Sequence, residues 1–579
     1  MQKKQFFSIF TVVVCIIATI CVQVVFTQVS YEDMLRDKCT VVVAGKEATN
    51  DGSVLSTHTC DSGLSDWTWR YVAPADHEPG AVRKIHHFDQ FRTTPSSKGL
   101  NWDNLEDIYT GFDIPEISHT YGYLHGMFGY MNDNQVAIGE STIGCRDELT
   151  NNTPTPKFDI TMLTLIAMER ARTAREAIRI MGDLCVEHGY GYVDSGEMLS
   201  VSDPNEIWIF EVMPVGPLWT PETGEPGAIW CAQRVPDDHV SVCPNESRIG
   251  EIDLNNKDYF MASDNVISFA IENGYYDPES GKPFSWKRAY SPLEESATSS
   301  NGSRGRLWRF FDLVAPSKNF SPDTPNMDFP FSIKPDEKMS MTSVLEILRN
   351  KFEGTPFYPA RGLQGGPYEN PNRLPYGFEL DGETYNTGRV FSVNRPEYIA
   401  ITQCRDWLPN PIGGLVWIAF GAMDTDCFMP FYQGVNRIPR SFQIGDHWEF
   451  DRRSARWAFD YVDFHTQVVY SYAIKDVRKA QEEWEAPAIE RVPEIDAQAL
   501  KLYRESPEKA TQFMTEYSNN NAKLVIDAWW ELGDKLLVKY NHLWIYNIKD
   551  RNREQIEYPE WWLRELVKYN NLKPVKKDK

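Results

Sequence analysis

The sequence predicts an α+β fold whose last part is helical, and three observations lead to this class. Runs rich in β-branched residues predict strands, the first of them at Cys39–Gly45 and Ser53–Thr59. Apolar positions at helical spacing predict helices at Thr161–Arg172 and Thr173–His188. From about Phe450 onward, long charged stretches carry aromatic residues at helical spacing, which predicts amphipathic helices that pack on the main domain.

Composition limits the class of protein. The chain has 579 residues, of which 42% are hydrophobic and 13% aromatic, enough to build one large core or two. Its formal net charge is -23. A nucleic-acid partner would need a basic face, so this charge balance argues against nucleic acid and fits a soluble, acidic protein.

The first residues have the pattern of a secretory leader. Lys3 and Lys4 precede an uncharged apolar run from Phe6 to Phe26. The run is typical of a signal peptide and is also long enough to cross a bilayer as a signal anchor, so both interpretations stay open. We expect the rest of the chain to be secreted, lumenal or lysosome-like in location, or anchored in a membrane through residues 6–26.

The cysteines beyond the leader are widely spaced. The chain has 10 cysteines, and those that remain after the apolar run and Cys39 follow no zinc or knottin pattern. In an oxidising compartment some of them could pair, but their odd number leaves one over. They are Cys60, Cys145, Cys185, Cys231, Cys243, Cys404 and Cys427. Sequons that permit N-glycosylation occur at Asn151, Asn245, Asn301 and Asn319.

The first two strands form a predicted hairpin. Asp51-Gly52 is a turn signal between them. If Gly45 pairs with the turn glycine, Cys39 lies opposite His58, and Asp61 lies just past the end of the second strand. The hairpin would therefore bring His58 to the Cys39 end of the sheet, with Asp61 close by.

The remaining elements follow in chain order. Val136–Gly139 is predicted as a strand and Glu140–Gly144 as the turn after it. Thr173-x-x-Glu176 is a capping-box pattern for the second helix, and Gly189 is a typical stop. The other predictions are strands at Glu197–Ser202 and Ile207–Val212, a short helix at Asp264–Asn273, long loops from Asp277 to Asp328, and strands at Val390–Val393, Tyr398–Gln403 and Leu415–Ala419.

Cys39 has the position of a nucleophile that a chain cleavage would activate. A cut before Cys39 would put a thiol and a free α-amine on one residue at the start of a strand. That pair supplies a nucleophile and its own base, since an α-amino group titrates at roughly 7.7–8.0. The structural alternative is a small buried residue, as is common for cysteine.

The segment after Cys39 resembles the N-terminal-nucleophile dipeptidases of peptidase family C69, which includes the secernins. The similar blocks occur in order between Cys39 and Arg440: Cys39-Thr40, Asp51-Gly52-Ser53, Asp61, and the blocks that begin at Asn132, Gly196, Gln233, Ala262, Gln403 and Pro430. The resemblance implies a four-layer αββα sandwich, self-cleavage at Lys38–Cys39, and hydrolysis of an amide bond, with dipeptides as usual substrates. This architecture agrees with the predicted mixture of strands and helices, because sheets with amphipathic faces must be covered.

The resemblance also implies roles for two residues near Cys39. Asp61 would accept hydrogen bonds near the thiol and the new ammonium group. Related bile-acid and penicillin amidases have an arginine three residues before this aspartate, whereas this chain has His58. His58 would donate a hydrogen bond and make activity sensitive to pH near about 6–7. The structural alternatives are a turn cap for Asp61 and a place within the sheet for His58.

Two further positions match the amidase relatives. Asn245 stands where they have an asparagine that binds the oxyanion, a contact worth about 3 kcal/mol when well aimed. Its alternative is a glycosylated sequon, which would exclude the site role. Arg306, in Arg306-Leu-Trp-Arg309, would orient the thiolate or bind a substrate carboxylate, or else be a structural surface arginine.

Taken together, these residues predict a cysteine amidohydrolase, foremost a dipeptidase with a small peptide substrate and no required metal or cofactor. The predicted division is a signal peptide or anchor with a propeptide at 1–38, a hydrolase domain at 39–450, and a helical region with a charged tail at 451–579. Two alternatives stay open. One is an acyl-amide hydrolase of the same fold with a non-peptide substrate, and the other is a non-enzymatic, secernin-like protein of secretion.

Overall fold

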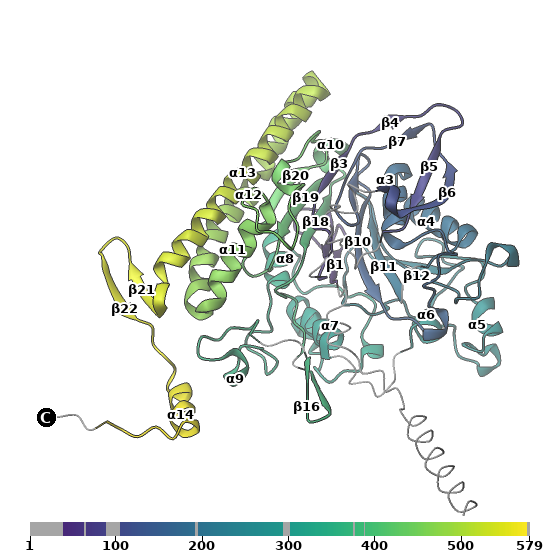
Figure 1. Ribbon diagram of the computed structural model, residues 1–579. Helices are drawn as coiled ribbons and strands as arrows, with labels where there is room; N and C mark the ends of the chain where they lie inside the picture. The colour runs from purple at the N-terminus through teal and green to yellow at the C-terminus, as the bar shows by residue number, and fades with distance from the viewer. Residues whose placement is uncertain are drawn as a thin grey trace, which may run out of the picture.

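A computed structural model describes residues 39–62, 65–88, 105–191, 195–292, 301–373, 377–386 and 388–575. The predicted leader and propeptide, residues 1–38, lie outside the described residues, as do the last residues of the charged tail. Two antiparallel sheets pack face to face, with helices on both outer sides (Figure 1). The predicted αββα sandwich is confirmed.

The first sheet has six strands and carries Cys39 at its start. Its order is β14 (Val240–Cys243), β1 (Val41–Ala44), β2 (Val54–Thr59), β18 (Tyr398–Cys404), β19 (Leu415–Phe420) and β20 (Met429–Tyr432). Every residue of these strands is buried, which explains their nearly continuous apolar and β-branched sequences.

The second sheet has eight strands. Its order is β15 (Phe260–Ala262), β13 (Ile229–Val235), β12 (Ile207–Met213), β11 (Gly196–Ser202), β10 (Ala137–Ile143), β9 (Gly129–Asn132), β8 (Tyr123–His125) and β3 (Arg70–Val72). Its β10 faces β2 of the first sheet, where Ser56 Oγ and Ser200 Oγ lie 2.6 Å apart. Gly139 permits this close approach, because a Cβ there would lie 2.7 Å from the Thr57 carbonyl oxygen.

Helices α3 (Ile160–Arg170) and α4 (Ala174–His188) cover the outer face of the second sheet. Thr173 caps α4 by accepting a hydrogen bond from the Glu176 N–H, and the helix ends at Gly189, whose φ is 82°. The predicted pair of helices and the Thr173 half of the predicted capping box are confirmed, whereas the Glu176 carboxylate accepts from the Arg172 N–H at 2.8 Å.

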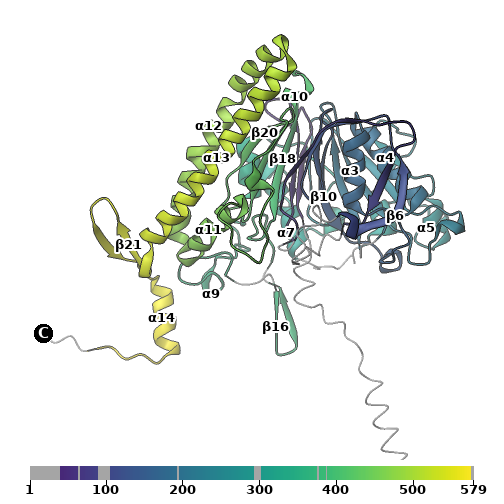
Figure 2. The same ribbon diagram turned by 45° about the horizontal axis from the view of Figure 1, so that its top comes forward.

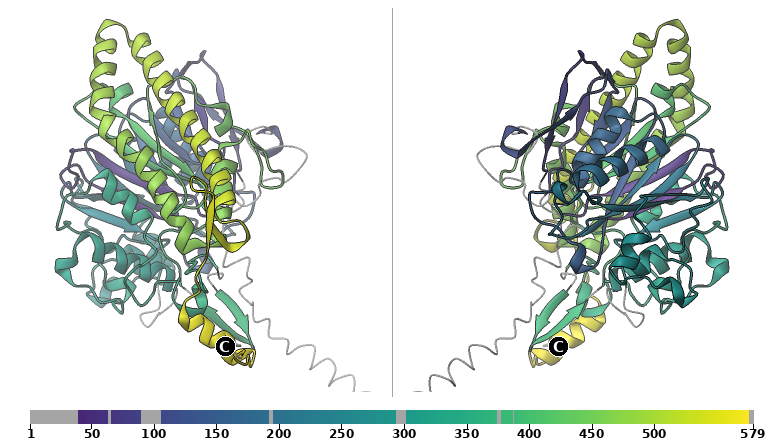
Figure 3. Two further views of the ribbon diagram at one scale, coloured as in Figure 1. Left: turned by 90° about the vertical axis from the view of Figure 1, so that its left-hand side faces the viewer. Right: turned by 90° about the vertical axis from the view of Figure 1, so that its right-hand side faces the viewer.

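The helical C-terminal region covers the first sheet. Its helices α11 (Ala455–Val468), α12 (Tyr470–Glu505) and α13 (Pro507–Lys539) lie against β19 and β20 (Figure 2). Figure 3 shows the two helix layers from opposite sides, with α12 and α13 facing the viewer on the left and α3 and α4 on the right. In the described part of the chain, none of the helices has the length and apolar character needed to cross a membrane.

Smaller elements complete the fold. The helices are α5 (Ser268–Glu272), α6 (Trp286–Tyr290), α7 (Asn301–Val314), α8 (Met341–Leu348), α9 (Gly362–Gly365), α10 (Asn410–Gly413) and α14 (Glu560–Tyr569). The remaining strands are β4 (Ala75–Asp76), β5 (Val82–His86), β6 (Tyr109–Pro115), β7 (His119–Thr120), β16 (Gly377–Leu380), β17 (Glu383–Asn386), β21 (Trp544–Asn547) and β22 (Asn552–Gln555).

Three local predictions are wrong. Glu140–Gly144 is not a turn, because β10 continues to Ile143 and pairs along its whole length with β11. Val390–Val393 is buried irregular chain rather than a strand. The segment Asp277–Asp328 is less open than predicted, since it contains α6 and α7. In each case long-range packing decided the structure over local composition.

Candidate active site

Cys39 lies immediately before β1 and is fully buried. The pairing of β1 with β2 joins Val43 to Ser56 and, through an isolated bridge, Thr40 to Thr59. The predicted register, which placed His58 directly opposite Cys39, is therefore wrong by two residues. At Gly45 the chain continues its ladder with β14, where the Gly45 N–H donates to the His239 carbonyl at 3.0 Å.

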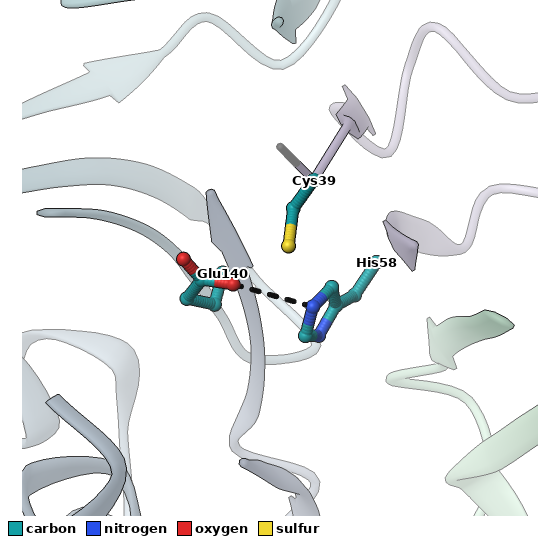
Figure 4. Close-up of side chains that lie close together, drawn as sticks. All are labelled: Cys39, His58 and Glu140. Carbon is teal, nitrogen blue, oxygen red and sulfur yellow. Dashed lines mark ion pairs between the residues drawn. The ribbon is translucent and has the colours of Figure 1, made fainter. Parts of the chain in front are cut away.

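The two-residue error leaves His58 on the correct face, because side chains of a strand alternate with a period of two. The Cys39 thiol, the His58 imidazole and the Glu140 carboxylate converge between the two sheets (Figure 4). The Cys39 sulfur, one ring nitrogen of His58 and one carboxylate oxygen of Glu140 lie within 4.8 Å of one another, and all three residues are buried. We call Cys39, His58 and Glu140 the Cys39 cluster.

His58 is held between aromatic rings and faces a carboxylate. Its ring centroid lies 5.2 Å from that of Phe128 and 5.3 Å from that of Tyr398. Nε2 lies 3.4 Å from Glu140 Oε2. Within the part of the chain that the structure describes, neither ring nitrogen has a hydrogen-bond partner of good geometry. The imidazole is thus oriented by packing while its nitrogens remain available at the thiol.

Glu140 was not among the predicted site residues. It reaches the site from β10, and its Oε1 accepts a hydrogen bond from Thr142 at 3.1 Å. Burial alone would raise the pKa of Glu140, but contacts with His58, Glu197 and Cys39 outweigh burial and lower it. A usable signal was present in the sequence, because Glu140 is a charged residue directly after the apolar run Val136–Gly139.

Arg306 holds the backbone of the nucleophile residue. From α7 its Nη1 donates to the Cys39 carbonyl at 3.0 Å and to Thr40 Oγ1 at 2.5 Å. Its Nη2 donates to the Pro244 carbonyl at 2.8 Å and to Asn245 Oδ1 at 3.0 Å. Arg306 is 1% exposed, so its guanidinium is an internal positioning group and not a surface arginine.

Asp61 lies beside the same network through an arginine that sequence reasoning missed. It is fully buried and forms an ion pair with Arg389 Nη2, while Arg389 Nη1 donates to Asn245 Oδ1 at 3.1 Å. Burial raises the pKa of Asp61, although Arg389, Arg395 and Arg306 oppose that rise. Arg389 directly precedes the segment predicted as a strand. This segment is irregular and has no periodic sequence pattern, so the sequence did not mark Arg389 as a site residue.

Asn245 is part of this network, and its amide hydrogens point into β10. Its Oδ1 accepts from Arg306 and Arg389, while Nδ2 donates to Ser141 Oγ at 3.2 Å and to the Thr142 carbonyl at 2.9 Å. A glycan on Nδ2 would break both of these bonds. The predicted oxyanion contact would need one of them to be exchanged for the substrate.

The Cys39 cluster also offers the atom types that bind transition metals. A metal ion at this position would engage the thiol sulfur and so compete with nucleophilic attack. A cavity of about 470 Å³ lies against α7, lined in part by Arg304, Gly305, Trp308 and Arg389. Arg304 and Trp308 lie roughly opposite Arg306 on the helix, but Arg389, which binds Asp61 and Asn245, also lines the cavity, so the cavity borders the active-site network.

Two antiparallel sheets between helix layers form an α+β architecture that is consistent with the N-terminal nucleophile type of fold. The sequence profile described as Peptidase family C69 matches residues 38–483. The chain therefore belongs to peptidase family C69.

Three relatives illustrate the similarity. A probable dipeptidase of Salmonella dublin is 27% identical over 415 residues, which cover 70% of this chain and 83% of the relative. A dipeptidase of Bifidobacterium longum (strain NCC 2705) is 25% identical over 427 residues, covering 69% and 72%. Probable dipeptidase B of Streptococcus pyogenes serotype M1 is 20% identical over 506 residues, covering 84% and 90%.

Proposed function

We propose that this chain is a self-processed cysteine dipeptidase whose nucleophile is the thiol of Cys39. One observation carries the proposal: Cys39 lies two residues before strand β1, and its carbonyl accepts a hydrogen bond from the buried Arg306. The names of the relatives support peptide hydrolysis, and membership of a peptidase family supports the same chemistry. Entry into the secretory pathway through residues 6–26 is part of the proposal.

The proposed reaction uses the two functional groups of a terminal Cys39. After the Lys38–Cys39 bond is cut, the α-amine takes the thiol proton, and the thiolate attacks the carbonyl carbon of the dipeptide. The ammonium group then gives its proton to the leaving amine as the carbon–nitrogen bond breaks. Water cleaves the resulting thioester, which releases the acid and restores the thiol. Backbone N–H groups and Asn245 would stabilise the oxyanion.

The first test is the N-terminus of the mature protein, measured by intact-mass spectrometry together with turnover of a dipeptide panel. We expect wild-type protein to begin at Cys39 and to hydrolyse dipeptides. Cys39→Ala should keep residues 1–38 and lose hydrolysis by at least about 1,000-fold, since no other group supplies the nucleophile. Cys185→Ala is the matched control, because Cys185 is a buried thiol in α4.

Three results would contradict the proposal in different ways. A mature chain that starts elsewhere would exclude the terminal amine as base. Turnover of N-acyl amines without turnover of any dipeptide would select the acyl-amide hydrolase, and a biological activity that survives Cys39→Ala would select the non-enzymatic alternative.

A further inference from the structure

The uncut chain lacks the base on which the proposed hydrolysis depends. While Lys38 is bonded to Cys39, the Cys39 nitrogen is an amide and cannot accept the thiol proton. Self-cleavage therefore needs a proton acceptor from elsewhere in the fold, close to the sulfur and present before any bond is cut.

We propose that His58 is the base for self-cleavage and that Glu140 positions its imidazole. This inference rests on the proposed function, because it explains how the terminal nucleophile is made. The relevant atoms of the Cys39 cluster lie within 4.8 Å of one another, and Figure 4 shows the thiol, the ring and the carboxylate turned toward one another. Imidazole is able to accept a proton near neutral pH, whereas a guanidinium at this position would not.

The hydrogen bonding of His58 differs from that of another buried histidine in the fold. His125 is 3% exposed, and its Nδ1 is engaged with the Gly126 carbonyl at 2.9 Å. His58 is 1% exposed, and both of its nitrogens lack such a bond among the described residues. In place of a backbone partner, His58 Nε2 faces the Glu140 carboxylate at 3.4 Å, and the ring lies beside the thiol.

A carboxylate lies beside His58. Glu140 Oε2 lies 3.4 Å from Nε2, and Glu140 in turn contacts Glu197 of the neighbouring strand. A buried carboxylate at this distance can orient the ring by attraction and hydrogen bonding. The cluster thus holds the three group types, nucleophile, base and carboxylate, that activate cysteine in other hydrolases, with Glu140 in contact with both the thiol and the imidazole.

The cleavage balances as follows. His58 accepts the Sγ proton, and the sulfur attacks the Lys38 carbonyl carbon to form a tetrahedral intermediate. The Lys38–Cys39 carbon–nitrogen bond breaks as the imidazolium returns the proton to the nitrogen, which becomes the Cys39 amine. The product is a thioester between Lys38 and Cys39. One water molecule cleaves it to the Lys38 carboxylic acid and the Cys39 thiol, and no redox partner is required.

Self-cleavage of the full chain is measured by pulse-labelled translation and mass spectrometry of the fragments. His58→Gly should slow it at least about 100-fold, the scale of a lost general base, and added imidazole should restore part of the rate. Glu140→Gln should slow it about tenfold, because it keeps the volume but loses the charge. His125→Gly and Glu211→Gln are matched buried controls and should cleave at the wild-type rate without responding to imidazole.

A second arm separates cleavage from hydrolysis. Met34→Asp, Leu35→Asp and Arg36→Asp create Asp-Asp-Asp-Asp-Lys before Cys39, because Asp37 and Lys38 are already present. Enteropeptidase then exposes Cys39 without self-cleavage. After this cut, we expect the His58→Gly variant to hydrolyse dipeptides at no less than about a tenth of the wild-type rate, since the α-amine now supplies the base.

The inference would be overturned if the His58→Gly variant cleaved itself at the wild-type rate. It would also be overturned if added imidazole left the reduced cleavage rate of this variant unchanged. If His58→Gly does not fold, His58→Gln decides the same question, because it preserves bulk and removes the base. A third outcome separates the two proposals. If wild-type protein cut by enteropeptidase hydrolyses no dipeptide while self-cleavage still depends on His58, the proposed substrate is refuted and this inference stands.

Discussion

Two regions of the molecule bury ionisable side chains, and they treat them differently. In the Cys39 cluster, the ring nitrogens of His58 have no hydrogen-bond partner within the described chain. Under the C-terminal helices lies a second group, which we call the Arg349 cluster. It comprises Arg349, Asp424, Asp426, Asp463 and Glu485.

The Arg349 cluster is held together by direct contacts. Arg349 donates to Glu485 through both Nη atoms, at 2.7 and 2.6 Å, and to Asp426 Oδ1 at 3.0 Å. The Asp424 carboxylate accepts from Tyr470 at 2.8 Å and lies 3.3 Å from Lys351 Nζ. These pairs join α8 and the β19–β20 connection to α12.

The contrast separates a structural role from a chemical one. Buried charges that are paired and hydrogen-bonded fix how elements dock. A buried imidazole packed between aromatic rings, with a carboxylate and a thiol both close to it, is arranged for proton transfer. Substitutions in the Arg349 cluster should therefore change stability, and those in the active-site network should change rates.

The largest expected effect is on stability. Arg349→Met should lower the free energy of unfolding by about 3–5 kcal/mol, because it leaves the Asp426 and Glu485 carboxylates buried without their cation. Denaturant unfolding followed by circular dichroism measures the loss. Arg453→Met is the control, since Arg453 pairs with Asp451 at an exposed position and should change stability by less than about 1 kcal/mol.

This result also tests the separation of roles. Folded Arg349→Met protein should still cut itself before Cys39 at close to the wild-type rate. A self-cleavage defect as large as that of His58→Gly would show that the two regions are coupled, and the comparison would fail.

An intermediate effect is expected at Asn245. Asn245→Asp keeps an oxygen for Arg306 and Arg389 but removes the Nδ2 donor. If the amide stabilises the oxyanion, kcat for dipeptide hydrolysis should fall about 100-fold with little change in KM, since the contact forms only in the transition state. An unchanged kcat would assign the oxyanion contact to backbone N–H groups and leave Asn245 as a support for the two arginines.

Local sequence patterns were sufficient for the elements that local rules govern. The Thr173 cap, the Gly189 stop and the apolar strands of both sheets are where the sequence predicted them. The helical texture after Phe450 also predicted the layer on the first sheet. Family blocks added the sandwich and placed Cys39, Asp61 and Asn245 near one another.

What could not be predicted depends on contacts between distant segments. Glu140 and His58 meet only because β10 of one sheet faces β2 of the other. Arg389 reaches Asp61 across 328 positions of sequence from an irregular segment with no periodic pattern. The hairpin register differs from the prediction by two residues, and β1 also pairs with β14, a strand that no local turn rule considers.

The smallest expected effect concerns pH and sharpens the comparison. Burial, with Asp424 nearby, raises the pKa of Asp463 to about 7. The folded state thus keeps a proton on Asp463 that the unfolded chain loses near its ordinary value of 3.8. Its contribution to stability is present at low pH and declines as pH rises toward 7, because the folded state binds more protons than the unfolded state in that window.

Asp463→Asn should remove this dependence. Asp463 Oδ1 accepts from Thr425 at 3.1 Å and from Gln467 at 2.8 Å, and an amide oxygen can accept both bonds. The variant should gain about 1 kcal/mol relative to wild type between pH 6 and 7, measured as the difference in free energy of unfolding. A difference that stays constant across this range would mean that Asp463 is ionised throughout, and that the Arg349 cluster contains enough positive charge to hold every carboxylate in its charged form.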